Sequence, residues 1–265
     1  MVRVGEDGGM PRIDETTIST VLARYLPERA RLIGLLADLD DEQWALPTEC
    51  PAYSVKGIAS HILGDDLSLL SRQRDGAMQG LVLISERMPG SDFRALLDGF
   101  NDQWVEATRY LSPSLLLQLL DLAGQWTYQY YCDVDPTAPG EPVPMFGVPF
   151  GESSPFWHAI AREYLERWAH HSQIRRALGM GSLADAPFLE TGHAIIATVA
   201  GAPTGELTDP IVDSDDRWLI GPIVLGGRSQ AADILTLGHS AQEVAELVNG
   251  PADSVREFAG RVGRR

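Results

Sequence analysis

The sequence predicts a mainly α-helical protein in which a bundle of long helices precedes a smaller α+β unit. In the first two thirds of the chain, apolar residues recur at spacings of three and four, as on one face of a helix. After Gly181 the pattern changes to short apolar runs separated by turns. We therefore expect a disordered or start-site extension over residues 1–15, a helix bundle over 16–180 and an α+β domain over 185–265.

The first two predicted helices follow from apolar periodicity and capping. The first covers residues 16–39, where Pro27 either kinks the helix or begins its second half. Its apolar stripe consists of Leu22, Leu26, Ile33, Leu36 and Leu39. Ser54 is a favourable N-cap for the second helix, which continues to about Asp75.

Two further long helices complete the predicted bundle. One covers about residues 91–111, and the other covers about residues 155–178 and is stopped by Gly179. Between them Ser112 begins a short helix, with Pro113 at the first helical position that proline favours. Four long helices favour a helix-bundle architecture.

The segment before the last long helix is predicted to be strand and loop. Residues 126–133 alternate as in a β-strand, with one side formed by Trp126, Tyr128, Tyr130 and Cys132. Residues 133–155 are rich in proline and glycine, which indicates a long loop or a loose hairpin. Loops of this length are often functional, so we expect the strand and loop to line a substrate pocket.

The C-terminal unit is predicted to combine short strands with helices. Ser240 and Glu243 form a capping box that begins one helix. A Gly226-Gly227 pair separates the two strands. The expected helices cover residues 188–199, 240–248 and 252–262, and the expected strands cover residues 217–225 and 231–237.

The composition of the chain excludes several classes of protein. The chain has 265 residues, of which 44% are hydrophobic and 22% charged, as is ordinary for a soluble globular protein. A net charge of -16 argues against nucleic acid or an anionic membrane as the main partner, because both attract basic surfaces. No apolar run approaches the ~20 residues of a membrane span, and residues 1–15 lack the apolar core of a signal peptide. We expect a cytoplasmic protein.

Cysteine usage agrees with a reducing compartment. Cys50 and Cys132 form neither a CxxC nor a zinc-ribbon spacing. We interpret them as free thiols, although a single disulfide stays open.

Three side chains are candidates for a metal site. Glu166 and His170 lie four residues apart on one predicted helix, so they project from the same side about one turn apart. His61 lies on an earlier helix, and all three border the apolar stripe of their own helix beside small residues. Two imidazoles and a carboxylate can hold a divalent metal and leave one coordination position open for chemistry. The hypothesis is that they converge on one cation.

Other interpretations of these residues stay open. A Glu/His pair at this spacing also occurs on solvated helix surfaces, where it contributes only some tenths of a kcal/mol, ~0.2–0.5. His61 alone is also compatible with a hydrogen-bonded interior histidine. Asp65 is a candidate extra ligand, an outer carboxylate that orients His61, or a capping or solvated residue.

Signatures of several other enzyme classes are absent from the sequence. The chain contains no GxSxG nucleophile elbow, no GxxxxGK(S/T) phosphate loop and no strand-linked GxGxxG. Arg217 and Arg228 are weak candidates for binding an acidic substrate. A structural role is favoured for the remaining histidines, which are His158, His171, His193 and His239.

Two motifs resemble those of a known family. The first is CPAYSV at residues 50–55 with ASHILGDD at 59–66, and the second is REYLERWAHH at 162–171 with QIRRALG at 173–179. Together they resemble the mycothiol-dependent maleylpyruvate isomerase group of the DinB-like superfamily. The resemblance implies a four-helix bundle that holds a metal, usually zinc, through two histidines and one acidic or third histidine ligand. The matching positions are His61, Glu166 and His170.

The chain departs from the family pattern at a few positions. Ala52-Tyr53 stand where the family often has Gly-Trp, and Gly57 stands where it has an acidic residue. Gln173 replaces an aspartate that some members carry. These departures remove no ligand, but they bear on the substrate and on the reaction.

The resemblance also implies a reaction. Metal coordination lowers the pKa of a thiol from about 8.5, so that the thiolate of a small molecule such as mycothiol attacks an electrophilic carbon. The outcome is S-transfer or cis–trans isomerisation, with a protein arginine orienting the substrate's carboxylate. Implied partners are this thiol and an electrophilic substrate, with no nucleic acid and no membrane; monomer and homodimer both stay open. The alternatives are a non-catalytic small-molecule or metal-binding regulatory module and a metal-dependent hydrolase.

Overall fold

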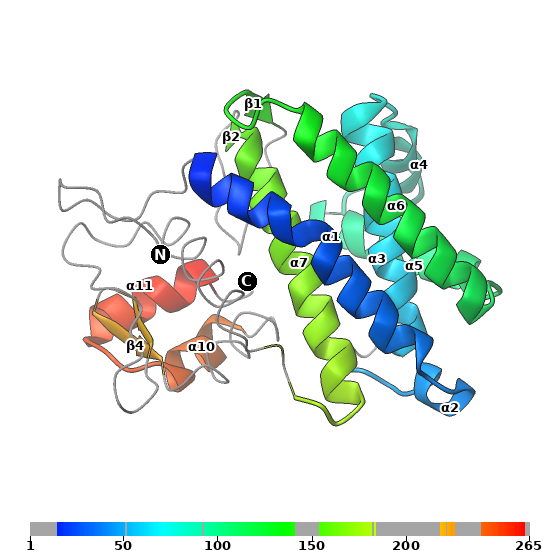
Figure 1. Ribbon diagram of the computed structural model, residues 1–265. Helices are drawn as coiled ribbons and strands as arrows, with labels where there is room; N and C mark the ends of the chain where they lie inside the picture. The colour runs from blue at the N-terminus through cyan, green and yellow to red at the C-terminus, as the bar shows by residue number, and fades with distance from the viewer. Residues whose placement is uncertain are drawn as a thin grey trace. The chain divides into compact units, whose positions relative to one another are not determined.

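A computed structural model of the chain shows a mainly helical protein, which confirms that part of the predicted fold class (Figure 1). The structure describes residues 15–50, 52–91, 93–140, 154–181, 183, 218–220, 222–225 and 240–262. Among these residues, no helix is both long and apolar enough to span a bilayer.

Four long helices contribute to one hydrophobic core. They are α1 (Glu15–Ala37), α3 (Val55–Leu69), α6 (Pro113–Asp133) and α7 (Phe156–Ala177). All four contribute side chains to one cluster of buried residues, which includes Leu36, Ile58, Ile62, Leu120 and Ile174. Burial of such apolar side chains contributes roughly 1.5–3 kcal/mol each before the entropic cost of ordering them.

Sequence signals set several helix boundaries. Ser54 caps α3 by accepting a hydrogen bond from the Gly57 N–H at 3.2 Å, and Ser112 caps α6 in the same way with the Leu115 N–H. α1 continues through Pro27 as one helix. At its C-terminal end α3 continues into a π-helical turn, η1 (Leu70–Arg74).

Three further described helices lie between these four in the chain. α2 (Asp41–Trp44) begins with a capping box formed by Asp40 and Gln43. α4 (Gln79–Arg87) was not expected from the sequence, whereas α5 (Phe93–Thr108) lies within the range predicted for a long helix. α5 packs against α3 and against α4.

The predicted strand at residues 126–133 is wrong, because this segment is the end of α6. The buried positions of α6 are spaced by three and four, which is the period of a helix, and Tyr131 is 1% exposed. Trp126, by contrast, is 45% exposed. On this helix Tyr128 lies on the side opposite to Trp126 and Tyr130, so the residues of the predicted strand side do not share one face. The helix begun at Ser112 is also long instead of short.

The ends of the predicted proline- and glycine-rich loop pair with each other. β1 (Pro139–Gly140) and β2 (Ser154–Pro155) are antiparallel, with Gly140 opposite Ser154. The residues between these strands lie outside the described part of the chain. α7 begins directly after β2 and ends before Gly179, whose φ of +72° is the left-handed conformation that glycine favours at a helix end.

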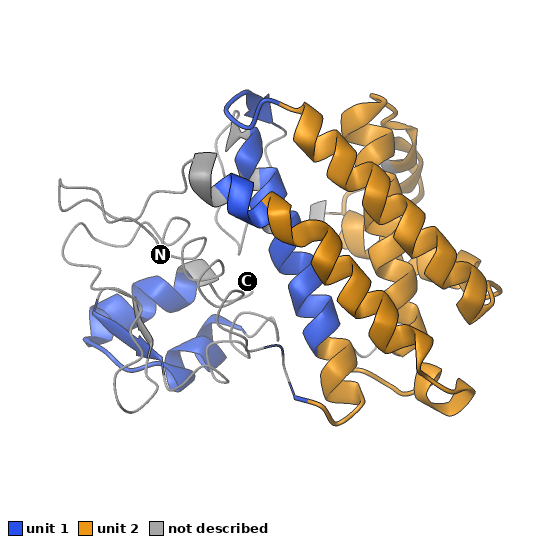
Figure 2. Ribbon diagram, viewed as in Figure 1, with its two compact units in different colours: residues 1–21, 135–172, 181–265 blue, residues 22–134, 173–180 orange. Residues whose placement is uncertain are grey.

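The chain divides into two compact units (Figure 2). Unit 2 consists of Leu22–Val134 and Gln173–Met180, and unit 1 consists of Met1–Val21, Asp135–Ser172 and Gly181–Arg265. α7 is one continuous helix whose last turns belong to unit 2. The predicted domain boundaries at 15, 180 and 185 stay predictions.

The described C-terminal residues of unit 1 contain a hairpin and two helices. β3 (Trp218–Ile220) pairs antiparallel with β4 (Ile223–Leu225), so the strand predicted over 217–225 is divided by a turn at Pro222. The capping box of Ser240 begins α10 (Ala241–Leu247), and α11 (Ala252–Val262) follows. The helix and strand predicted at residues 188–199 and 231–237 lie outside the described residues.

Candidate metal centre

α3 places His61 and Asp65 one turn apart on the same side of the helix. His61 is buried, with 8% of its surface exposed, whereas the Asp65 side chain is 27% exposed. The His61 Nε2 lies 3.4 Å from the Asp65 Oδ2. This spacing is that of an i, i+4 pair on an α-helix, so continuation of the helix after the Ser54 cap is enough to bring the two groups together.

α7 forms a second pair with the same spacing. The His170 Nε2 lies 3.7 Å from the Glu166 Oε2. The His170 side chain is largely buried, whereas the Glu166 side chain is 45% exposed. Ile174, one turn after His170, belongs to the hydrophobic core cluster, which fixes the rotation of α7 about its own axis.

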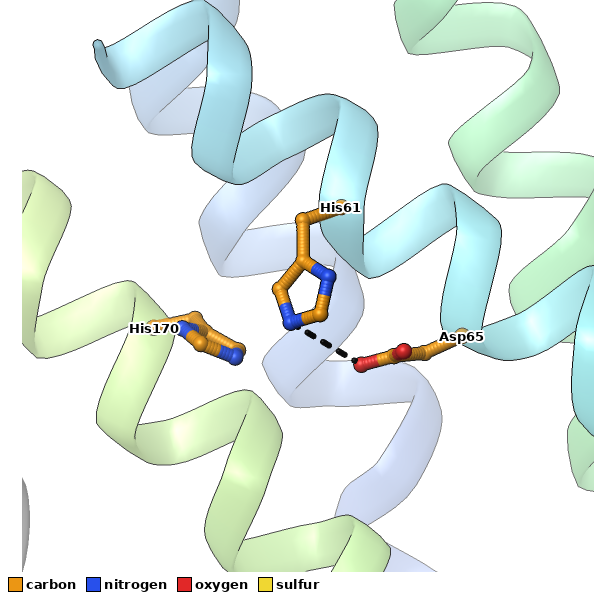
Figure 3. Close-up of side chains that lie close together, drawn as sticks. All are labelled: His61, Asp65 and His170. Atoms are coloured by element: carbon orange, nitrogen blue, oxygen red, sulfur yellow. Dashed lines mark ion pairs between the residues drawn. The ribbon is translucent and has the colours of Figure 1, made fainter. Parts of the chain in front are cut away.

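His61, Asp65 and His170 form a group of possible metal-binding side chains (Figure 3). One ligand atom from each lies within 4.8 Å of those of the other two. In Figure 3 the two imidazole rings, from α3 and α7, and the carboxylate of Asp65 extend into one common space. Zn–N and Zn–O distances of about 2.0–2.2 Å put the donors of one tetrahedral ion roughly 3.3–3.6 Å apart, so small side-chain rotations would suffice to bind it.

The structure thus brings two of the sequence-predicted residues, His61 and His170, into one group. Glu166 lies beside His170 but outside this group, and the carboxylate within it belongs to Asp65, which the sequence offered as an extra or outer ligand. Ligation by His61, Glu166 and His170 stays a prediction.

Tyr53, which the sequence indicated only as a departure from the family pattern, is a neighbour of the site. Its ring lies 5.8 Å from the His61 ring, centroid to centroid, at 30°. The Tyr53 hydroxyl donates to the Asp102 Oδ1 at 2.8 Å. Burial, and then this bond and the charge of Asp102, raise the pKa of Tyr53 well above its usual range, so the phenol stays protonated. A Cβ at Gly57 would lie 3.0 Å from the Tyr53 Cβ, which explains why a small residue stands there.

Asp66 is held on the core side of α3. Its carboxylate is fully buried and accepts from the Arg29 Nη2 at 2.6 Å and from the Thr127 Oγ1 at 3.1 Å. The Arg29 guanidinium also donates to the Leu120 carbonyl at 3.4 Å. A buried charge needs such partners, so Asp66 fixes α3 against α1 and α6 and is not directed to the histidines.

The other side chains that the sequence suggested as candidates are not among the described members of this group. His171 is buried on α7. The side chain of His158 is not described, and His193, His239, Arg217 and Arg228 lie outside the described residues. Neither Cys50 nor Cys132 forms a disulfide.

Two imidazoles and a carboxylate, presented by two helices, are side chains of the kind that hold a divalent metal in helical bundles. A family described as Mycothiol maleylpyruvate isomerase N-terminal domain matches residues 25–175, more than half of the chain. The chain belongs to this family, which confirms the resemblance inferred from the two motifs. The family relates it to mycothiol-dependent, isomerase-like enzymes that use a small-molecule thiol. No match was found among curated proteins or among solved structures.

Proposed function

We propose that this protein is a metal-dependent enzyme that uses a small-molecule thiol such as mycothiol on an electrophilic substrate. The observation that carries the proposal is the group of His61, Asp65 and His170, whose ligand atoms lie within 4.8 Å of one another. Membership of the mycothiol maleylpyruvate isomerase family supports the choice of thiol.

The proposed ligands are His61, Glu166 and His170, with zinc as the preferred divalent ion. Nitrogen and carboxylate donors suit zinc, and three protein ligands leave one coordination position for substrate or thiol. Asp65 is the rival of Glu166 for the carboxylate position, because its Oδ2 lies 3.4 Å from the His61 Nε2. If Glu166 is the ligand, Asp65 acts as an outer carboxylate that orients His61.

When bound, such a metal lowers the pKa of a coordinated thiol, so that the thiolate dominates near neutral pH. In the isomerisation we propose, the thiolate sulfur adds to one carbon of a C=C bond conjugated to a carbonyl. The resulting C–C single bond rotates, and loss of the thiolate restores the double bond without net consumption of thiol. In S-transfer, the neighbouring carbon instead takes up the proton that the thiol released on ionisation, and the new C–S bond persists in the product.

The protein groups around the site prepare it for this chemistry. Burial of His61 restricts the access of water to its imidazole, and less water around a thiolate makes the sulfur a better nucleophile toward carbon. The ring of Tyr53 lies beside that of His61, and its bond to Asp102 holds the Tyr53 ring in this place.

Metal analysis of purified variants tests the ligand assignment. We expect about one zinc per chain in the wild type and near-complete loss in His61→Ala and His170→Ala. Glu166→Gln and Asp65→Asn, compared side by side, identify the ligand carboxylate as the one whose loss lowers occupancy more. Asp121→Asn on the exposed side of α6 is the control and should bind as the wild type does. Full metal retention in both histidine variants would refute the site.

An activity assay then separates the possible reactions. Metal-loaded protein is mixed with mycothiol and an activated cis-alkene, and thiol and alkene geometry are followed together. Isomerisation without loss of thiol, or stoichiometric thioether formation, supports the proposal. Turnover that is independent of thiol indicates a hydrolase, and retained metal without turnover indicates a binding module.

We also infer that residues 185–265 form a small α+β domain. In support, the Val224 and Asn249 backbones pair, which joins the hairpin to the segment after α10, and α11 packs on both α10 and β4. Limited proteolysis of the full chain should release a resistant C-terminal fragment that begins near residue 185. A protected fragment that extends without a break from α7 to the C-terminus would contradict this division.

A further inference from the structure

A stripe of apolar side chains runs along an exposed side of α6. Leu115, Leu122 and Trp126 each keep between 41% and 45% of their surface exposed, and Leu119 between them is partly buried. At ~100° per residue, the four side chains lie within about 60° of one another around the helix. Single exposed leucines are ordinary on protein surfaces, whereas a continuous apolar stripe is typical of a surface that contacts a partner. We call these four residues the α6 stripe.

The α6 residues beside this stripe are uncharged. The chain has a net charge of -16, yet α6 contains two charged residues, Asp121 and Asp133, of which Asp133 is the last residue of the helix. Asp121 lies ~140° around the helix from the stripe. The side chains that flank the stripe toward solvent are exposed glutamines, namely Gln118, Gln125 and Gln129. A second copy of this acidic chain can therefore approach α6 without a carboxylate at the point of contact.

The spacing of the α6 stripe is symmetric. Its members are separated by four, three and four residues, so its centre lies midway between Leu119 and Leu122. Two copies of α6 that pack antiparallel about a two-fold axis at this centre bring Leu119 opposite the partner's Leu122. The same axis brings Leu115 opposite the partner's Trp126. A two-fold interface requires a surface that is complementary to itself, and the α6 stripe meets this requirement.

The charges at the two ends of α6 favour the same orientation. Asp133 is as far from the centre of the stripe as Thr108, so the antiparallel register brings it close to the partner's Arg109. The Arg109 side chain is more than half exposed, although it pairs with Glu106 at 2.6 Å, and Asp133 is also exposed. A parallel pair would instead bring Asp133 beside the partner's Asp133. Charge complementarity therefore selects the antiparallel pair.

The size of the α6 stripe limits the strength of such a contact. The exposed parts of its side chains cover only a few hundred Å², whereas a stable complex buries ~800 Å² on each partner. Flanking glutamines and the ends of the helix add area without reaching that of an obligate interface. We therefore expect a reversible contact with a Kd of roughly 10 μM to 1 mM.

We propose that the α6 stripe is the interface of a homodimer in which α6 of one copy packs antiparallel on α6 of the other. The second copy is the occupant that the symmetric spacing, the uncharged flank and the opposite charges at the helix ends select. This inference goes beyond the proposed function and does not depend on the metal or on the thiol.

Sedimentation equilibrium of the full chain between about 5 μM and 1 mM tests the dimer. The wild type should change from the mass of one chain to twice that mass. Leu122→Glu should raise the Kd by more than tenfold, because it replaces an apolar contact by two carboxylates close to the two-fold axis. Leu83→Glu on α4 is the matched control, since Leu83 is also an exposed leucine, and it should dimerise within about twofold of the wild type. Both variants should keep the melting temperature of the wild type.

A charge exchange tests the contact between the helix ends. Arg109→Glu and Asp133→Arg should each raise the Kd by about threefold to tenfold, because each places like charges at both ends of the interface. The double variant restores opposite charges and should return the Kd to within about twofold of the wild type. Single and double variants with equal affinity would contradict the antiparallel register.

A spin label on the exposed thiol of Cys132, in a Cys50→Ser background, measures the orientation of the pair. Each Cys132 lies beyond the centre of the stripe on opposite sides, so the two labels should be roughly 35 Å apart along the helix axis at ~1.5 Å per residue. A parallel pair would place them at the same height and much closer together.

Four outcomes would overturn the proposal. The first is a wild-type chain that stays monomeric at 1 mM, ~1,000-fold above a micromolar Kd. The second is a dimer that Leu122→Glu leaves intact, and the third is a dimer that Leu83→Glu abolishes, which would assign the interface to α4. The fourth is a large loss of melting temperature in monomeric Leu122→Glu, which would mean that the stripe is covered within its own chain.

Discussion

Asp65 and Asp66 are consecutive carboxylates on α3, and the structure gives them opposite environments. Asp66 faces the core, where it is fully buried and bonded to Arg29 and Thr127. Asp65 faces the histidine group and keeps 27% of its side chain exposed. One residue turns a helix by ~100°, so a single step along α3 separates a group that holds helices together from one that is available to a ligand.

The largest expected effect is on the free energy of unfolding, and it comes from a substitution on the side of α3 that faces the core. Asp66→Asn removes the charge that compensates the buried Arg29 guanidinium, and we expect a loss of about 3–5 kcal/mol in the free energy of unfolding. Urea denaturation measures this loss. Asp65→Asn makes the same chemical change one residue earlier and should cost less than about 1 kcal/mol. Equal destabilisation by the two variants would remove the distinction between the two sides of α3.

Gly64, which precedes Asp65 and Asp66, lies on a third side of α3. Gly64→Ala places a Cβ against the Trp104 indole and should destabilise the protein by roughly 1–3 kcal/mol through overpacking. Gly34→Ala on α1 is the control, because nothing lies within 4 Å of the added Cβ, and it should stabilise the chain by about 0.5–1 kcal/mol. Thermal unfolding of both variants compares them. A stabilised Gly64→Ala would mean that Trp104 does not pack as described.

A substitution on the side of α3 that faces the histidines should change metal affinity and not the free energy of unfolding. Asp65→Asn should lower zinc affinity by about 10–100-fold, since it removes a carboxylate next to His61. Competition with a chromogenic chelator measures this affinity. Asp66→Asn, assayed at a temperature where it is folded, should keep wild-type affinity. Loss of zinc from Asp66→Asn alone would reverse the roles of the two carboxylates.

The smallest expected effect concerns the aromatic neighbour of His61. Tyr53→Phe removes the bond to Asp102 and should cost about 0.5–1.5 kcal/mol at neutral pH. Because the folded protein raises the pKa of Tyr53 above the ordinary value of about 10, the unfolded chain loses the phenolic proton first. The stabilisation is therefore complete below pH ~10 and declines as the pH rises above it. Urea denaturation between pH 8 and 11 should show a shallower decline for Tyr53→Phe than for the wild type.

Local signals in the sequence predicted local structure well. Ser54, Ser112 and Ser240 each cap a helix as expected, because a cap depends on a hydrogen bond to a residue three positions ahead. Residues 126–133 were misread as a strand because their aromatic side chains alternate. Burial of Thr127 and Tyr131, four residues apart, instead follows from packing against other helices, which no local pattern reports.

At the candidate site, too, the sequence predicts contacts within one helix better than contacts between helices. The His61–Asp65 and Glu166–His170 spacings follow from helix geometry alone. The proximity of His61 to His170 depends on how helices more than 100 residues apart in the chain pack. The spacing of these residues offered this proximity only as a hypothesis, which the family resemblance supported. The contact of Gly64 with Trp104 depends on where α5 packs, and the partners of Asp66 depend on three helices at once.

The bonds around Asp66 also bear on how the protein assembles. Their members stand at positions 29, 66 and 127, so the cluster forms only after segments separated by many residues have met. Closure of such long loops costs entropy before the contacts compensate for it, so we expect this step to occur late in folding. A nascent chain that ends before α6 lacks both the Thr127 hydroxyl and the Leu120 carbonyl, and would keep the Arg29–Asp66 pair in contact with water until the rest of the bundle is synthesised.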